Sequence, residues 1–416
     1  MKLEVTPAVP ALDTELHIRL TDVAPGDEVT LESTNHDAMD RLWSAHATFV
    51  AAADGTVDLT RDAPVAGSYT GVDPMGLVWS MSLQQSTGSG PFTVTASVDS
   101  GPSAEASVER LRYPAGVTRE VVDADGLVGV LCYPEEGPAR PGVILVGGAE
   151  GGLHDVDAAL MAAHGFTVLA LAYFGAPGVP SGLVCVPLEY FGTAIDWLLA
   201  HERVMGDRVG MIGGSRGGEA SLLVASTFER VGAVVSLVGS GVLTQGISYS
   251  SGALLDILRT DVPSWTWRGA PLPYLPYAIP PELEQLVAAG EPVPLRLAFP
   301  TGDTAPLAEN AIEVERIRGA VLLLSAEHDY GWDSPILSEV AMTRLARARH
   351  PYPYEHIVYP GAGHDIAPPP YGPTTERTSP GPGVLFASGG TPEATAAARA
   401  DQWRRSIAWF AEHLIV

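Results

Sequence analysis

The feature that most constrains this chain is the stretch VGMIGGSRGGEASLLVAS at residues 209–226. Its pattern predicts a short apolar strand, a turn crowded with glycine, and then an amphipathic helix. The turn contains the pentapeptide G-x-S-x-G at residues 213–217. Glycines let the backbone turn sharply, and a serine held in such a turn projects its hydroxyl beyond the edge of a sheet. We therefore predict that Ser215 is a nucleophile and that the N–H of Arg216 faces a developing oxyanion.

Ser215 also has a simpler interpretation. A serine between a strand and a helix commonly caps the helix, and a chain with 45 glycines can match a short glycine motif by chance. The strand–turn–helix context favours the nucleophile, because the motif requires that context. A base and an acid elsewhere in the chain would strengthen the prediction.

A serine nucleophile needs a base to take its proton and an acid to orient that base. In α/β-hydrolases the order along the chain is serine, acid, histidine, with each residue following a strand. Asp329 ends the predicted strand AVLLLSAEHD, and His364 follows the predicted strand YEHIVYPGAG. The sequence therefore predicts the triad Ser215, Asp329 and His364. The neighbouring residues that we weighed for the same roles are Glu327, His328, Asp333, His356 and Asp365.

A second glycine-rich turn, GGAEGG at residues 147–152, follows an early apolar strand. In an α/β-hydrolase the loop at this place supplies the second oxyanion donor, and we assign that role to the backbone N–H of Gly148 or Ala149. Such a turn could also hold a phosphate. It lacks the Lys-Ser/Thr ending of a P-loop and does not match G-x-G-x-x-G, so a nucleotide site is the weaker alternative.

The hydrophobic pattern divides the chain in two. Residues 1–112 show short alternating runs, GLVWSMSL at 76–83 among them, separated by turns about every ten residues. This pattern predicts an antiparallel β-sandwich with Trp79 in its core. Residues 113–416 alternate apolar strands with amphipathic helices, apart from the proline-rich stretch at 367–384, which is expected to be irregular. The alternation predicts a parallel sheet covered on both faces and, with the triad, an α/β-hydrolase domain. Residues 240–318 interrupt this alternation. We interpret them as an insertion over the carboxyl ends of the strands, a lid or acyl pocket, with a plain surface excursion as the alternative.

Composition excludes several classes of function. The formal net charge is −25 and no Lys/Arg cluster is present, which argues against nucleic-acid binding and against docking on an anionic membrane. Cys132 and Cys185 lie in apolar runs and are expected in the core. We predict no metal and no cofactor. The N-terminus lacks a signal-peptide pattern, no run reaches 18 apolar residues, and the ending EHLIV is not a peroxisomal address, so we expect a soluble cytoplasmic protein.

Several stretches together resemble a known family. They are DPMGLVW at 73–79, LRYPAGVTRE at 111–120, PGVILVGGAEGG at 141–152, GFTVLALAYFG at 165–175, LEYFGTAIDWL at 188–198, the serine stretch at 209–226 and YPGAGHDIAPPPY at 359–371. The chain resembles the acyl-CoA thioesterase and bile acid-CoA:amino acid N-acyltransferase family over nearly its whole length. The resemblance implies an N-terminal β-sandwich and a C-terminal α/β-hydrolase domain. By position it implies the roles of nucleophile, acid and base for Ser215, Asp329 and His364.

The resemblance also bears on the reaction. The acyltransferase branch of the family typically has cysteine where this chain has Ser215, which favours thioester hydrolysis. Two features depart from the family: the segment 240–318 differs in detail, and the strong negative charge is unusual for an enzyme that holds CoA. Arg203, Arg208 and Arg216 could supply local positive charge, although surface positions are the simpler interpretation of Arg203 and Arg208.

We therefore predict a serine thioesterase that hydrolyses an acyl-CoA or a carrier-protein thioester through an acyl-serine intermediate. Three alternatives stay open. The acyl group could pass to an amine or hydroxyl acceptor, the substrate could be an oxygen ester or a peptide, or the domain could be a binding module without activity. Sequence gives neither the acyl chain length nor the oligomeric state.

Overall fold

The computed structural model describes residues 1–99, 101–302 and 304–414. The chain forms two compact units, and neither is a continuous piece of sequence. The first unit consists of Met1–Ala115, Pro369–Arg377 and Thr391–Ala400. The second consists of Gly116–Pro368, Thr378–Gly390 and the described residues from 401 onward.

The first unit is an antiparallel β-sandwich, which confirms the predicted fold of this part. One sheet has the order β1-β2-β5, and the other has the order β6-β4-β3-β8-β9 with β7 paired to β4. Residues alternate between buried and exposed along the strands, and the buried ones, such as Ile18, Leu31 and Phe49, form an apolar core. The strands are β1 (Lys2–Thr6), β2 (His17–Thr21), β3 (Glu28–His36), β4 (Arg41–Val50), β5 (Val57–Asp58), β6 (Ala66–Gly67), β7 (Ser82–Thr87), β8 (Phe92–Val98) and β9 (Ser103–Val108).

The sequence GLVW in this unit is a short helix, α1 (Gly76–Trp79), where its apolar run predicted a strand. The Asp73 carboxylate accepts hydrogen bonds from the Met75 N–H at 2.8 Å and from the Trp79 ring N–H at 2.8 Å. These bonds favour a helical turn at this point, so the next strand, β7, begins only at Ser82. Trp79 is buried as expected.

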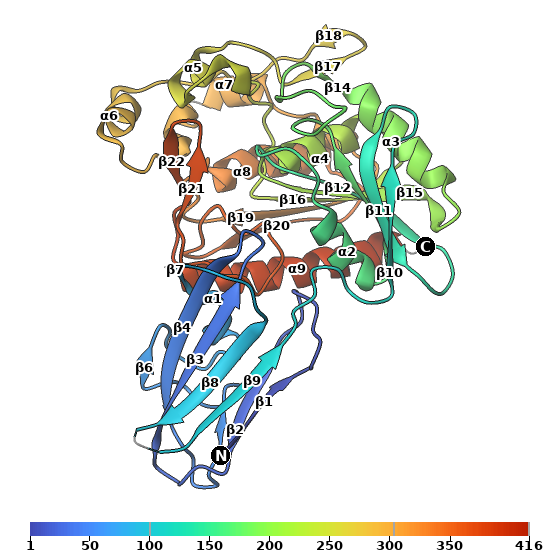
Figure 1. Cartoon of the computed structure of the whole chain (residues 1–416). Helices are drawn as coiled ribbons and strands as arrows, with labels where there is room; N and C mark the ends of the chain where they lie inside the picture. The colour runs from blue at the N-terminus through green and yellow to red at the C-terminus, as the bar shows by residue number, and fades with distance from the viewer. Residues whose placement is uncertain (100, 303, 415–416) are drawn as a thin grey trace. The chain divides into compact units, whose positions relative to one another are not determined.

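The second unit contains a mixed sheet that has, within the described ranges, eight strands in the order β10-β11-β13-β12-β15-β16-β19-β20 (Figure 1). The pairs β10–β11 and β11–β13 are antiparallel, and the remaining neighbours are parallel. This order is that of an α/β-hydrolase, as predicted. The strands are β10 (Val117–Val122), β11 (Val128–Pro134), β12 (Arg140–Val146), β13 (Thr167–Ala172), β15 (Val204–Gly214), β16 (Val231–Leu237), β19 (Ala320–Ala326) and β20 (Tyr354–Tyr359).

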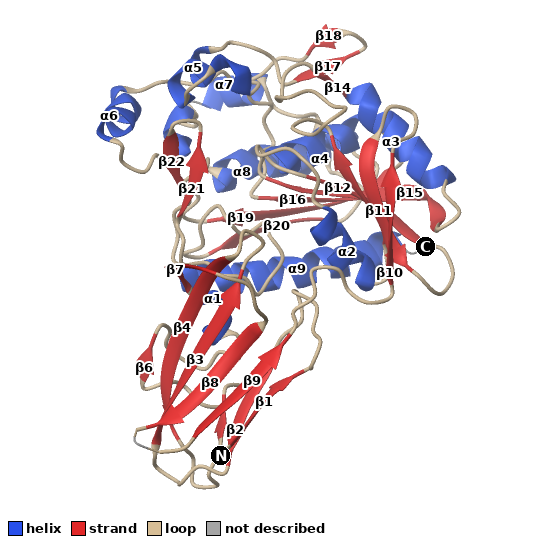
Figure 2. Ribbon diagram, viewed as in Figure 1, coloured by secondary structure: helices blue, strands red, loops and turns tan. Residues whose placement is uncertain are grey.

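Helices cover both faces of this sheet (Figure 2). They are α2 (Asp155–Ala163), α3 (Leu188–Ala200), α4 (Arg216–Thr227), α8 (Ser334–Ala348) and the second-unit part of α9 (Pro392–Leu414). The inner strands β13, β16 and β19 are therefore buried along their whole length. Burial on both faces explains why these strands were recognisable as unbroken apolar runs.

Much of the chain between β16 and β19, which we call the β16–β19 segment (residues 238–319), packs in an apolar cluster apart from the main core of the sheet. Val242, Leu254, Leu275 and Phe299 are buried together with Trp332 in one apolar cluster. Its elements are η1 (Tyr249–Ser251), α5 (Leu254–Arg259), β17 (Trp265–Trp267), β18 (Ala270–Pro271), α6 (Pro281–Ala289), η2 (Leu295–Ala298), α7 (Thr304–Glu309) and η3 (Val314–Arg316). Strand β14 (Val186–Pro187) pairs with β17.

Two smaller expectations were wrong. The proline-rich sequence after residue 367 was expected to be irregular, but it contains the hairpin of β21 (Thr378–Gly381) and β22 (Val384–Ala387). Val293 of the β16–β19 segment bonds this hairpin twice, since its N–H donates to the Leu385 carbonyl and its carbonyl accepts the Ala387 N–H. Cys185 is exposed rather than buried in the core, whereas Cys132 is buried.

Among the described helices, none is both long and apolar enough to span a bilayer.

We predict that Phe410→Ala destabilises the second unit. The Phe410 ring is fully buried between the ring of Phe166, with centroids 6.2 Å apart, and the backbone of Gly210. Its removal leaves a cavity and should lower the free energy of unfolding by about 3–5 kcal/mol. Urea denaturation followed by tryptophan fluorescence measures the change. Glu412→Ala, on an exposed position of the same helix, is the control and should change it by no more than about 0.5 kcal/mol. Equal effects of the two substitutions would contradict the prediction.

Candidate active site

Ser215 lies between the end of β15 and the first residue of α4, with φ +54° and ψ −119°. This backbone conformation is rare for a residue with a side chain, and it turns the serine hydroxyl away from the helix. A Cβ on Gly213 would lie 2.5 Å from the Gly217 carbonyl, and a Cβ on Gly217 would lie 2.5 Å from the Gly147 carbonyl. The turn therefore closes only with glycine at both positions. Ser215 makes no side-chain capping bond to α4, which excludes the simpler interpretation of this residue.

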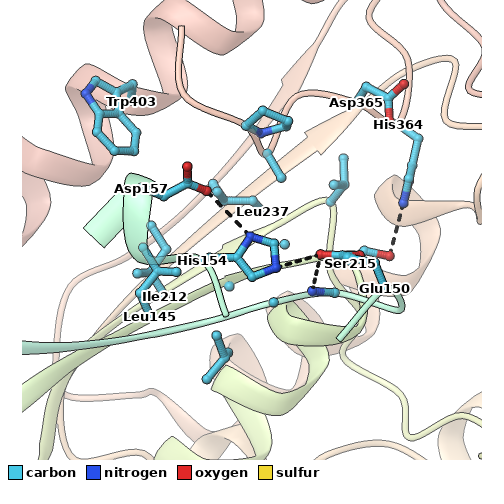
Figure 3. A pocket seen from close by; sticks show the side chains of 18 residues that line it. Leu145, Glu150, His154, Asp157, Ile212, Ser215, Leu237, His364, Asp365 and Trp403 are labelled. Carbon is cyan, nitrogen blue, oxygen red and sulfur yellow. Dashed lines mark hydrogen bonds and ion pairs between the residues drawn. The ribbon is translucent and has the colours of Figure 1, made fainter. Parts of the chain in front are cut away.

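The structure brings the three residues of the predicted triad together. The His364 Nε2 lies 3.0 Å from the Ser215 Oγ, and the His364 Nδ1 lies 2.7 Å from Oδ1 of Asp329 (Figure 3 shows His364 pointing at Ser215). Asp329 is buried, and the same oxygen accepts the backbone N–H groups of Gly331 and Trp332. Because the carboxylate accepts from Nδ1, the other ring nitrogen faces the serine hydroxyl and can accept its proton.

The neighbouring residues weighed for the same roles have other contacts. Glu327 is exposed and accepts the Gly361 N–H, and Asp333 accepts the Thr301 hydroxyl. His356 lies in β20 with its Nε2 2.9 Å from the Ser325 Oγ. His328 is exposed. Of the neighbours considered, only Asp365 lines the same cavity as Ser215.

A cavity of about 220 Å³ opens beside Ser215 and His364. Its apolar wall includes Leu145, Ile212, Leu237 and Trp403, and its charged lining consists of Glu150, His154, Asp157, Asp365 and His364 (Figure 3). None of the 18 described residues that line this cavity is Arg or Lys. Among these described lining residues, the two histidines are thus the only ones able to carry positive charge.

Sequence reasoning missed the charged row Glu150, His154 and Asp157. The Glu150 Oε1 lies 3.1 Å from the His154 Nε2, and the Asp157 carboxylate lies 3.7 Å from the His154 Nδ1. Burial alone would lower the pKa of His154, but the two carboxylates outweigh it and raise the pKa to about 10. His154 in turn lowers the pKa of Glu150. The signal was present in the sequence as Glu150 and His154 four residues apart, next to a glycine-rich turn.

The two candidate donors in the 147–152 turn differ in their bonding. The Gly148 N–H donates to the Glu150 carboxylate at 2.8 Å. The Ala149 N–H donates no hydrogen bond to another backbone carbonyl of the described residues. The roles of both N–H groups, and of the Arg216 N–H, stay proposals.

The arginines that were considered as a source of positive charge lie elsewhere. The Arg216 guanidinium is buried and lies 3.0 Å from the Glu219 carboxylate. Arg203 donates to the carbonyls of Glu135 and Gly137, and Arg208 donates to the carbonyl of Arg318. None of the three lines the cavity, so an anionic part of a substrate would have to be held outside it.

Comparison with known families covers both units. A model described as "Acyl-CoA thioester hydrolase/BAAT N-terminal region" matches residues 13–124, and one described as "BAAT / Acyl-CoA thioester hydrolase C terminal" matches residues 186–416. BAAT is the bile acid-CoA:amino acid N-acyltransferase. The chain belongs to this thioester hydrolase and acyltransferase family. It is accordingly an enzyme of the α/β-hydrolase type.

Family members from mammals align along almost their whole length. Peroxisomal succinyl-coenzyme A thioesterase of Mus musculus is 30% identical over 421 residues, covering 97% of this chain and 94% of that protein. Acyl-coenzyme A thioesterase 1 of Homo sapiens is 31% identical, covering 97% and 94%. Acyl-coenzyme A amino acid N-acyltransferase 1 of Mus musculus is 30% identical, covering 100% and 98%. One relative is named as peroxisomal, so a cytoplasmic location for this chain stays a prediction.

We predict that the reactivity of Ser215 rises with pH and reaches half its maximum near pH 9. Burial alone would lower the pKa of His364, but Asp329, with smaller effects of Asp365 and Glu150, raises the pKa to about 9. Only the neutral imidazole can accept the serine proton, so the reactive form accumulates as pH increases through that value. The measurement is the rate at which a fluorophosphonate labels the protein between pH 6 and 10.

The variant Asp329→Asn tests the cause of this pH dependence. Without the carboxylate the pKa of His364 should fall, so the midpoint should move to lower pH, and the maximal rate should fall because the ring loses its orientation. Ser215→Ala provides the blank. A wild-type midpoint near the ordinary histidine value, unchanged in Asp329→Asn, would show that the Asp329 carboxylate does not set the pKa of the base.

Proposed function

We propose that this chain is a serine thioesterase, which hydrolyses an acyl-CoA or a related acyl thioester to a free acid and a thiol. The observation that carries the proposal is the continuous contact from Ser215 through His364 to Asp329, at 3.0 Å and 2.7 Å, at the wall of the cavity. Family membership supports thioesters as the substrate class, since relatives of both named activities act on coenzyme A derivatives.

The reaction follows from these positions. His364 takes the proton of the Ser215 hydroxyl, and the serine oxygen attacks the thioester carbonyl carbon. Negative charge develops on the carbonyl oxygen, where the Arg216 N–H and the N–H of Gly148 or Ala149 would stabilise it. The C–S bond breaks, and the thiol leaves with the proton from His364. Water then attacks the acyl-serine, with His364 as base, and the free acid is released as Ser215 regains its proton.

The cavity lining limits where a CoA substrate can lie. Because no Arg or Lys side chain is among the described lining residues, the cavity suits the uncharged acyl and thioester part rather than phosphate groups. The nucleotide of CoA, or a carrier protein in its place, would remain outside. This arrangement requires no cofactor and no metal for the steps above.

Ser215→Ala tests the nucleophile. The variant should lose hydrolysis by about 10⁴-fold or more in kcat, since the triad acts as a unit. Purified protein is incubated with acyl-CoAs of increasing chain length, and free acid is measured by mass spectrometry. Ser226→Ala is the matched control, because in the part of the chain that the structure describes its hydroxyl bonds the Leu223 carbonyl of the same helix and no triad residue. Full activity of Ser215→Ala would end the proposal.

Acyl transfer is the second candidate, and the N-acyltransferase relative that aligns along this entire chain favours it. The same acyl-serine could be attacked by an amine in place of water. Adding glycine or taurine to the mass-spectrometric assay separates the two outcomes: we expect free acid in every lane, and a conjugate that exceeds the acid would assign the chain to transfer. A parallel panel of 4-nitrophenyl esters would reveal a carboxylesterase if oxygen esters were turned over faster than thioesters.

A further inference from the structure

The buried side chain of Arg216 connects the turn of the nucleophile to the β16–β19 segment. Its guanidinium donates to the carbonyl of Thr244 at 3.3 Å and to the hydroxyl of Ser264. The Ser264 hydroxyl in turn donates to the same Thr244 carbonyl at 2.6 Å. Arg216 is 2% exposed, so these bonds form in a region without competing water. The residue whose N–H would face the oxyanion is thus held by its side chain.

Glu219, one turn further along α4, strengthens this connection. Its carboxylate lies 3.0 Å from the Arg216 guanidinium and also accepts the Thr244 hydroxyl at 2.7 Å and the Trp265 ring N–H at 2.9 Å. Thr244, Ser264 and Trp265 all belong to the β16–β19 segment. The first turn of α4 therefore cannot shift relative to that segment without breaking several buried polar bonds.

Tyr249, in the same segment, bonds the second glycine-rich turn of the site. Its hydroxyl donates to the carbonyl of Ala149, in the turn that would supply the second oxyanion donor. The Ala149 carbonyl and the Glu150 N–H share one planar peptide unit, so this bond fixes that unit and restricts the backbone of Ala149, whose own N–H is a candidate donor. Within the turn itself, the Glu150 carboxylate accepts the Gly148 N–H and holds the backbone there.

We propose that the β16–β19 segment is the positioning element of the oxyanion site, and that Tyr249 and Ser264 are positioning residues that fix its two halves. The inference rests on the proposed acyl-serine mechanism. Backbone donors stabilise an oxyanion only when they stay within hydrogen-bond distance of the place where the charge develops. Because one segment holds both donor-bearing turns, their spacing is set by the segment rather than by the turns alone.

The test uses the full chain and the variants Tyr249→Phe and Ser264→Ala, each of which removes one hydroxyl. Misplacement of a donor affects the transition state more than substrate binding, so we expect kcat to fall about tenfold for each variant with KM changed by less than about twofold. The substrate is the acyl-CoA that the wild-type protein turns over fastest. Tyr274→Phe is the matched control, because it removes a hydroxyl of the same segment that bonds exposed Asp261.

A trifluoromethyl ketone gives a readout that a merely structural role would not move. It forms a tetrahedral adduct with a reactive serine, and its oxygen occupies the oxyanion position. The inhibition constant should rise in parallel with the loss of kcat in both variants and stay at the wild-type value in Tyr274→Phe. Wild-type kcat and ketone affinity in both variants would overturn the inference, as would a change in KM alone, which would assign the segment to substrate binding.

These outcomes are separate from those for the proposed function. If Ser215→Ala is inactive while Tyr249→Phe and Ser264→Ala behave as wild type, the positioning role is wrong and the thioesterase mechanism stands. If Ser215→Ala retains activity, the mechanism itself is wrong. Thermal denaturation of each variant verifies that the loss of a hydroxyl has left the fold intact.

Discussion

The backbone of Ser215 is held in a conformation that costs a residue with a side chain roughly 1–3 kcal/mol, and the rest of the second unit supplies the packing that maintains it. Glycines on both sides let β12 and the start of α4 approach within distances that a Cβ would forbid. The order of the strands then brings the loops after β19 and β20 to the same edge of the sheet. Asp329 and His364 reach the serine because that edge is shared.

Charge is distributed unusually around this site. The chain carries a large excess of negative charge. The lining of the cavity is negative too, with three carboxylates and two histidines. Such surroundings favour the protonated forms of the histidines, which is why His154 and His364 both have raised pKa values. The negatively charged surroundings make neutral His364 a stronger base. They also keep most of the imidazole protonated at neutral pH. The raised pKa of His364 and its capacity to accept a proton thus both follow from the neighbouring negative charges.

The parts predicted correctly are those where a single sequence pattern has a single structural solution. Unbroken apolar runs predicted the inner strands, and the order of three residues after strand ends predicted that Ser215, Asp329 and His364 lie together, as they do. Their catalytic roles stay a proposal. The errors lie where one side chain or a long-range contact decides the local structure. The run at 76–79 is helical where Asp73 accepts bonds from Met75 and Trp79, and the 378–387 hairpin is bonded by Val293, some ninety residues earlier. The spacing of Glu150 and His154 is present in the sequence, but only the folded turn shows that the two side chains form a pair.

The two units share the chain in an interleaved way. Pro369–Arg377 and Thr391–Ala400 belong to the first unit, although the second unit surrounds them in sequence, and Thr374 bonds the Trp79 carbonyl of the sandwich. A sandwich encoded by the first 115 residues alone would lack two of its own pieces. A truncation after residue 115 therefore would not reproduce this unit, and the relatives named above likewise align from end to end rather than over one unit.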